Sequence, residues 1–151
     1  MKKIRINAFQ TLKGFLSGQE NDKEEYFAYS ACLRIFGDEL NLDLITKELG
    51  VYPTYSHKKG DKKGKTIHKQ NAWMYESQID ENVHMDKHIN DLWIKFQNKI
   101  EFLKGLKEKH QVDIFLGYRS NCDHAGIEIA NENLKIFNAL EIPFGLSIIV
   151  C

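Results

Sequence analysis

The residues of this chain that could bind a metal are two histidines one helical turn apart. His84 and His88 have Asp86 between them, and this spacing places both imidazoles on one helix face, as in zinc-binding helices. The metalloprotease pattern needs a glutamate directly after the first histidine, and Met85 stands there instead. Because both histidines border an apolar stripe and no third ligand is identifiable, the sequence favours half-buried side chains over a metal site, and we predict no cofactor.

A second candidate is the run Cys122-Asp123-His124, which we expect in a turn between two strands. Cys122 and His124 could point the same way because adjacent residues of an extended chain alternate in direction. Two ligands make an incomplete metal site. A cysteine–histidine nucleophile pair would also need an orienting group and an oxyanion hole, and neither can be assigned. The sequence therefore favours no catalysis at this turn.

The most unusual surface is a lysine-rich loop from Ser56 to Lys69. Asp61 is its only acid, and Gly60 and Gly64 permit tight turns. The loop lacks the Walker spacing and precedes a strand, whereas phosphate-binding loops open a helix. It could instead steer an acidic partner, or be a solvated loop in which Asp61 closes a turn on backbone N–H groups. Its lysines are Lys58, Lys59, Lys62, Lys63, Lys65 and Lys69.

Two residues outside the loop could complete an anion-binding site. Arg34 lies near the end of an apolar strand, and Trp73 lies in the strand that follows the loop. With the lysines they could hold an anion and stack on a base, as single-stranded nucleic-acid sites do. The sequence favours the simpler interpretation of each, which is an arginine paired with a carboxylate and a tryptophan in or beside the core.

The stretch from residue 26 to 61 must position these residues. Its first ten residues alternate with aromatic and branched side chains on both faces, which predicts a strand inside the sheet. Asn41 is a good helix N-cap, and Leu42, Ile45 and Leu49 share one helical face. Gly50 can take the left-handed conformation that closes the helix.

The remaining elements predict an α+β fold. We expect a mostly antiparallel mixed sheet of about five strands with three helices on one face. From Asn71 onwards the order is β-α-β-β-α-β, which is ferredoxin-like. A short extra strand at 4–8 and a helical turn at 12–16 precede the core. The later elements are expected at 71–77 (strand), 83–109 (helix), 112–119 and 125–129 (strands), a helix capped by Asn131, and 144–150 (strand).

Composition and charge narrow the class of protein. The chain has 151 residues and a formal net charge of zero, which fits one globular domain without the positive field of general nucleic-acid binders. Cys32, Cys122 and Cys151 form no paired motif, which indicates a reducing cytoplasm. We recognise no signal peptide and no membrane-spanning run, so we expect no membrane partner.

The ordered motifs resemble the domain of unknown function 4279 family, a bacterial family of uncharacterised domains. Its pattern is an arginine-containing strand ending in Gly-Asp, a short helix ending in Leu-Gly-x-x-Pro, a Lys-Gly-Asp loop and a following tryptophan. The resemblance implies a small α+β domain without an established activity. It suggests a single domain, 1–151, with a variable extension over 1–24 and a family-like core over 25–151. The matching residues are Arg34, Phe36, Gly37, Asp38, Leu49, Gly50, Pro53, Lys59, Gly60, Asp61 and Trp73.

Some family members look like standalone genes near secreted toxin genes, which hints at immunity proteins. We therefore expect a non-enzymatic bacterial protein-binding domain whose partner is a cognate toxin or another protein. The lysine-rich loop would meet an acidic face, or the acidic remainder of the chain would block a basic nuclease cleft. One alternative is a small anionic ligand or nucleic-acid binding domain that uses the loop, Arg34 and Trp73. The other is a metal-dependent enzyme that uses His84 and His88. The oligomeric state stays open.

Overall fold

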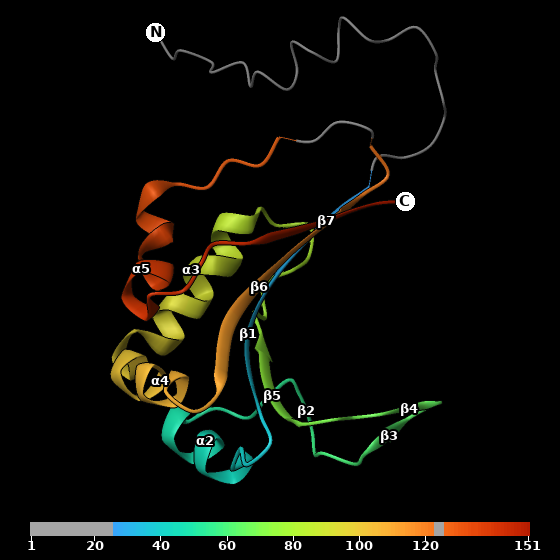
Figure 1. The fold of residues 1–151 in the computed structure, drawn as a ribbon. Helices are drawn as coiled ribbons and strands as arrows, with labels where there is room; N and C mark the ends of the chain where they lie inside the picture. Colours follow the sequence, from blue (N-terminus) through green and yellow to red (C-terminus); the bar gives the residue numbers. More distant parts are fainter. Residues whose placement is uncertain (1–25, 123–125) are drawn as a thin grey trace, which may run out of the picture.

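The computed structural model describes residues 26–122 and 126–151 as a mixed sheet with helices on one face (Figure 1). The five strands lie in the order β2-β5-β1-β6-β7. This arrangement confirms the predicted α+β class. The strand and helical turn expected before residue 26 lie outside the described residues. The strands of the sheet are β1 (Phe27–Gly37), β2 (Tyr55–His57), β5 (Asn71–Glu76), β6 (Gln111–Ser120) and β7 (Leu146–Val150).

Strand β1 is the centre of the sheet, as its two apolar faces predicted. It pairs antiparallel with β5 on one side and with β6 on the other. Strand β2 adds to β5 antiparallel, and β7 adds to β6 in parallel. Since the chain reaches β7 through a helical crossover, the parallel pairing follows from the connection.

The face of the sheet that the helices cover carries the core. Leu33 and Ile35 of β1 are fully buried, and their antiparallel partners on β5 are Tyr75 and Trp73. Ile89 of α3 is also fully buried and belongs to the same cluster. The helices are α2 (Leu42–Leu49), α3 (Met85–Phe96), α4 (Ile100–Lys107) and α5 (Lys135–Leu140), with 3-10 turns at Gln97–Lys99 and Asn131–Leu134. None of the helices in the described ranges is long and apolar enough to cross a membrane.

Helix α2 forms as its capping residues predict. The Asn41 side chain accepts a hydrogen bond from the N–H of Leu44 at 3.0 Å. At the other end, Gly50 adopts the left-handed conformation with φ 72°, and its N–H donates to the carbonyl of Thr46. Both ends of this short helix are therefore capped, and Ile45 and Leu49 bury its apolar face.

The long helix expected at 83–109 is broken into α3 and α4, so that prediction is wrong in its continuity. His84 is the N-cap, and the break falls at the polar run Gln97-Asn98-Lys99. The apolar stripe continues through the break, because Phe96 and Leu103 are both fully buried.

Two further predictions near the C-terminus are wrong. Residues 126–130 are irregular rather than part of a strand at 125–129, and residue 125 lies outside the described ranges. The described order from Asn71 onwards is therefore β-α-α-β-α-β, and the ferredoxin-like order is not seen. Asn131 begins a 3-10 turn with no side-chain cap, instead of capping a helix. The apolar residues Ile127 and Ile129 pack on the core from an irregular segment, which explains why their alternation resembled a strand.

Two features lie outside the helix-covered core. No helix in the described ranges packs on the other side of the sheet, which we call the open face (Figure 1). Strands β3 (Lys62–Lys63) and β4 (Thr66–Ile67) form a separate antiparallel ribbon within the lysine-rich loop. Figure 1 shows this ribbon extending away from the body, beyond the end of β2.

Candidate functional site

The lysine-rich loop folds as a hairpin, and we call residues 58–69 the lysine hairpin. Lys62 pairs with Ile67 and Lys63 with Thr66 across its two short strands. Gly64 at the tip has φ 60°, a conformation that favours glycine. All six lysine side chains are exposed. The chain therefore presents its cations on a ribbon with a defined backbone.

The base of the lysine hairpin is a turn closed by Asp61. The Asp61 carboxylate accepts from the N–H of Lys58 at 2.7 Å, and the Asp61 N–H donates to the Lys58 carbonyl at 3.1 Å. Gly60 has φ 92°, and its N–H donates to the carbonyl of His68 at 2.8 Å. The prediction that Asp61 closes a turn on backbone N–H groups is confirmed, so this acid organises the backbone of the hairpin.

Asn71 ties the lysine hairpin to the body of the protein. Its side-chain oxygen accepts from the N–H of Lys59 at 2.7 Å. Its amide nitrogen donates to the carbonyls of Asp38 and Leu40 at 3.2 and 3.0 Å. The ammonium of Lys59 also reaches the Asp38 carboxylate at 3.1 Å. The direction in which the hairpin projects is therefore set by contacts to the turn after β1. Sequence reasoning missed Asn71 because it carries no motif of its own.

A second group at the base is aromatic. His57 of β2 and His68, just after β4, are stacked with ring centroids 3.5 Å apart. The hydroxyl of Tyr55 lies 3.4 Å from Nε2 of His68. The ammonium of Lys63 lies 5.2 Å from the centre of the Tyr55 ring, within cation–π range. Burial, followed by the proximity of His68, lowers the pKa of His57. The sequence offered no signal for this stack, because it depends on the pairing of the strands.

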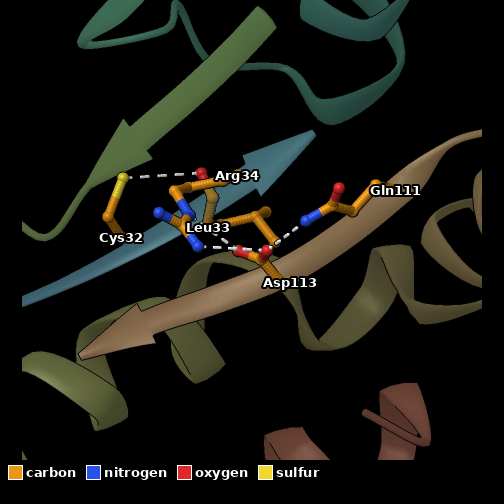
Figure 2. Close-up of polar contacts among 5 residues, drawn as sticks. All are labelled: Cys32, Leu33, Arg34, Gln111 and Asp113. Atoms are coloured by element: carbon orange, nitrogen blue, oxygen red, sulfur yellow. Dashed lines mark hydrogen bonds and ion pairs between the residues drawn. The ribbon is translucent and has the colours of Figure 1, made fainter. Parts of the chain in front are cut away.

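Arg34 lies on the open face and is paired with Asp113. Figure 2 shows the two side chains pointing toward each other from β1 and β6. Nε of Arg34 donates to Oδ1 of Asp113 at 2.7 Å, and Nη2 donates to Oδ2 at 3.1 Å. Gln111 adds a third bond to the same carboxylate at 2.9 Å. This two-point pair confirms the carboxylate-paired interpretation of Arg34.

The Arg34 guanidinium also lies against two aromatic rings. Its central carbon is 4.8 Å from the centre of the Phe115 ring and 5.6 Å from that of Phe36. Both contacts lie within the range of cation–π attraction. Beside it, burial is the largest cause that raises the pKa of Cys32 to about 12, so this thiol stays protonated and unreactive at neutral pH. The cluster holds strands β1 and β6 together rather than offering a free cation.

Trp73 lies on the opposite side of the sheet from Arg34. It is fully buried, and its indole N–H donates to the hydroxyl of Thr46 in α2 at 3.0 Å. The ring is therefore not exposed for stacking on a ligand, and the core interpretation is confirmed. The structure does not bring Arg34, Trp73 and the lysines into one site.

The two histidines of the candidate metal pair have separate structural roles. His84 caps α3, with Nδ1 accepting from the N–H of Asp86 at 3.5 Å. His88 is buried, and its Nε2 lies 3.0 Å from the carbonyl of Val83. Burial lowers the pKa of His88, which favours the neutral ring. Within residues 26–122 and 126–151, no three histidine, cysteine or acidic side chains gather as a metal site would require.

The Cys122 turn is described only in part, because Asp123 and His124 lie outside the described residues. The N–H of Cys122 donates to the hydroxyl of Ser120 at 3.0 Å.

A hollow of about 260 Å³ on the open face is bordered by Glu76, Glu81 and Arg119. Arg119 is already engaged there, since it donates to the Tyr26 hydroxyl at 2.7 Å.

Comparison with known proteins places the chain in a family. The family model described as Domain of unknown function (DUF4279) matches residues 25–150. The chain belongs to this family. No curated protein and no solved structure matches it.

Several of the residues on which the resemblance rests build the joint from which the lysine hairpin projects. Asp38 and Lys59 form an ion pair, and Asp61 closes the turn that follows. At Gly37 a Cβ atom would lie 2.3 Å from Nδ1 of His110, so any other residue would force this imidazole to shift. Trp73 binds α2 to β5 behind the joint. The motif therefore accounts for how the hairpin is positioned.

Proposed function

We propose that this DUF4279 protein is a non-enzymatic binding domain whose lysine hairpin docks on an acidic face of a partner protein. The observation that carries the proposal is the contrast between the exposed lysines and the fixed base. Lys62 and Lys65 are exposed at the tip, while Asp61 and Asn71 hold the base by hydrogen bonds to backbone groups. A ribbon held in this way loses little conformational entropy on binding.

The charge around the lysine hairpin supports an electrostatic role. The carboxylate of Asp61 is directed to the backbone of Lys58, and Asp38 offsets the charge of Lys59 alone. The tip therefore keeps a net positive charge although the whole chain is formally neutral. A local field of this kind accelerates association with an acidic surface and weakens as salt is added.

A protein partner fits the geometry better than a small anion. A site for a small ligand needs several groups that converge on one cavity. Arg34 is engaged by Asp113 and Trp73 is buried against Thr46, so neither converges on the lysines. A flat ribbon of lysines instead matches an extended acidic surface.

The narrower form of the proposal is a bacterial immunity protein that neutralises a cognate toxin. It rests on the family resemblance and on the hint that some members have genes near those of secreted toxins. A reducing compartment such as the cytoplasm belongs to this proposal, because Cys32, Cys122 and Cys151 are free thiols.

The test is capture of the product of the adjacent gene, followed by charge reversal in the lysine hairpin. The variant Lys62→Glu/Lys63→Glu/Lys65→Glu should slow association about tenfold or more at low salt. The matched control, Lys47→Glu/Lys87→Glu/Lys109→Glu, makes the same change of net charge at exposed sites elsewhere. The proposal fails if no neighbouring gene product forms a complex, or if both variants lose the same affinity.

The competing function is binding of a small anion or of nucleic acid by the same lysines. A thermal-shift screen against nucleotides and oligonucleotides, repeated over a salt titration, separates the two. A salt-sensitive rise in melting temperature with one of these ligands would favour the competitor. An unchanged melting temperature across the panel would leave the protein partner as the supported function.

A further inference from the structure

The last strand, β7, forms one edge of the sheet. It pairs with β6 along Leu146–Val150, and no other strand in the described residues pairs with it. An edge strand of this kind presents unpaired backbone groups to any strand that can approach. The chemistry of that edge therefore decides what can bind it.

The side chains of β7 are uncharged and unusually exposed. Ile148 keeps 59% of its surface exposed, Ile149 54% and Val150 56%. Ile148 and Val150 lie on the helix-covered side of the sheet, and Ile149 lies on the open face. Apolar side chains are therefore accessible to solvent on both sides of the strand, and pairing with a further strand would bury part of their surface.

The backbone of β7 also faces outward at defined positions. The N–H of Cys151 donates to the carbonyl of Ser120 on β6 at 2.9 Å. Because backbone groups alternate along a strand, residues 147 and 149 face β6 as residue 151 does. The backbone groups of Leu146, Ile148 and Val150 consequently point to the free edge. They offer three evenly spaced positions for hydrogen bonds to another strand.

The opposite edge of the sheet differs in each of these respects. Strand β2 has only three residues, Tyr55–His57, and the lysine hairpin follows it directly. Short edge strands and nearby lysines are the usual protections against unwanted pairing. Strand β7 has neither, so the sheet is protected at one edge and open at the other.

We propose that β7 pairs antiparallel with β7 of a second copy of this chain, forming a two-fold dimer with one continuous sheet. The two strands can exchange hydrogen bonds only where the outward-facing residues Leu146, Ile148 and Val150 of one copy lie opposite those of the other. When the two strands overlap along their full length, the two-fold axis passes through Ile148. Ile148 then lies opposite its own copy, Leu146 opposite Val150, and Ser147 opposite Ile149. All of these residues are uncharged, and the pairs of branched aliphatic side chains stabilise antiparallel strands.

A second copy fits this edge because β7 complements itself. Two-fold pairing places residue 148 opposite its own copy, so a charge there would meet a like charge across the axis. The strand Leu-Ser-Ile-Ile-Val carries none. A contact limited to five residues per chain is small, so the dimer should be weak and form in the micromolar range. This inference is independent of the lysine hairpin, which lies at the other edge.

Sedimentation over a concentration series tests the dimer. The wild-type chain should pass from monomer to dimer as its concentration rises through the micromolar range. Ile148→Lys sets two ammonium groups against each other at the axis and should raise the dissociation constant about tenfold or more. The matched control is Ile94→Lys, because Ile94 is 60% exposed and belongs to α3, not to β7. This control should dimerise as the wild type does.

A proline variant tests pairing at the free edge without disturbing the pairing of β7 with β6. Ile148→Pro removes an outward N–H that makes no bond to β6, so dimerisation should be lost while the melting temperature of the monomer changes little. The register is tested by Gly145→Cys, since residue 145 would lie opposite Cys151 of the second copy in a non-hydrogen-bonded pair. Mild oxidation should then form a dimer on a non-reducing gel, and Gly145→Cys with Cys151→Ser should not.

Four results would overturn the proposal. The first is a wild-type chain that stays monomeric throughout the series. The second is protection of the Ile148 and Val150 amides from hydrogen exchange at concentrations where the chain is monomeric, which would assign the edge to another segment of this chain. The third is a dimer that Ile148→Lys and Ile94→Lys affect equally. The last is a dimer in which Gly145→Cys forms no disulfide with Cys151.

Discussion

The imidazole of His57 is stacked on that of His68, with an angle of 19° between the two ring planes. His57 lies just before the lysine hairpin, and His68 lies within the hairpin, directly after β4. A proton on either ring would place a positive charge against its neighbour and close to Lys63. The lowered pKa of His57 favours the neutral form of its ring, so the stack should depend on pH.

The first prediction concerns this dependence. Burial and the neighbouring His68 lower the pKa of His57 below its usual 6.5, while Asp61 opposes and Lys63 adds to the shift. The unfolded chain then binds more protons than the folded chain just below that pH. The contribution of His57 to stability should be complete above pH 6.5 and should be lost as the pH falls through its lowered pKa.

Thermal unfolding as a function of pH measures this effect. His57→Gln should weaken the loss of melting temperature in acid, because it removes one group that takes up a proton on unfolding. His88 contributes in the same direction, since burial lowers its pKa too, so a residual slope is expected in the variant. An acid dependence equal to that of the wild type would contradict the role given to His57.

The second prediction concerns Gly37 and His110. Gly37→Ala should destabilise the protein by about 1–3 kcal/mol, because its Cβ would overlap the imidazole of His110. Urea unfolding measures the change. His110→Ala in the same chain should recover part of the loss, since it removes the atoms in the way. If the double variant loses the sum of the two single effects, the clash is not the cause.

The third prediction concerns the ion pair on the open face. Arg34→Leu leaves the Asp113 carboxylate partly buried without its partner and should cost about 1–2 kcal/mol. Arg34→Lys keeps the charge but not the two-point geometry, so it should recover only part. The double variant Arg34→Leu/Asp113→Leu should be more stable than Arg34→Leu alone, because both leucines would lie beside Phe115. Purely additive free energies of unfolding would argue against coupling between Arg34 and Asp113.

The fourth prediction concerns the thiols. Cys151 is exposed, whereas the pKa of Cys32 is raised to about 12, mainly by burial. A thiol reagent at neutral pH should therefore modify Cys151 quickly and Cys32 slowly. Cys151→Ser should remove the fast phase, and Cys32→Ser should leave it unchanged. Rapid labelling of Cys32 in the folded chain at neutral pH would contradict the raised pKa of this thiol.

Signals from residues close together in the sequence were sufficient to predict much of the fold. The caps of α2 could be predicted because Asn41 and Gly50 act on their nearest backbone neighbours. The central place of β1 followed from its two apolar faces, and the role of Asp61 followed from turn chemistry within four residues. Each of these depends on contacts that are short in sequence.

The parts that could not be predicted depend on contacts distant in sequence. The bridge from Asn71 to Asp38 and Leu40, and the His57–His68 stack, exist only once the strands have paired. Ile127 and Ile129 alternate as a strand would, yet they pack on the core from an irregular segment. Periodicity reports which side chains are buried, and it cannot report whether the backbone finds a neighbouring strand.

The order of the strands has a consequence for synthesis on the ribosome. β1 occupies the middle of the sheet, but both of its neighbours, β5 and β6, are translated after it. While residues 71–120 are still being made, an apolar strand with two free sides leaves the exit tunnel without its partners. Such a strand is prone to aggregation during that interval. We expect the nascent chain to depend on chaperones until β6 has emerged.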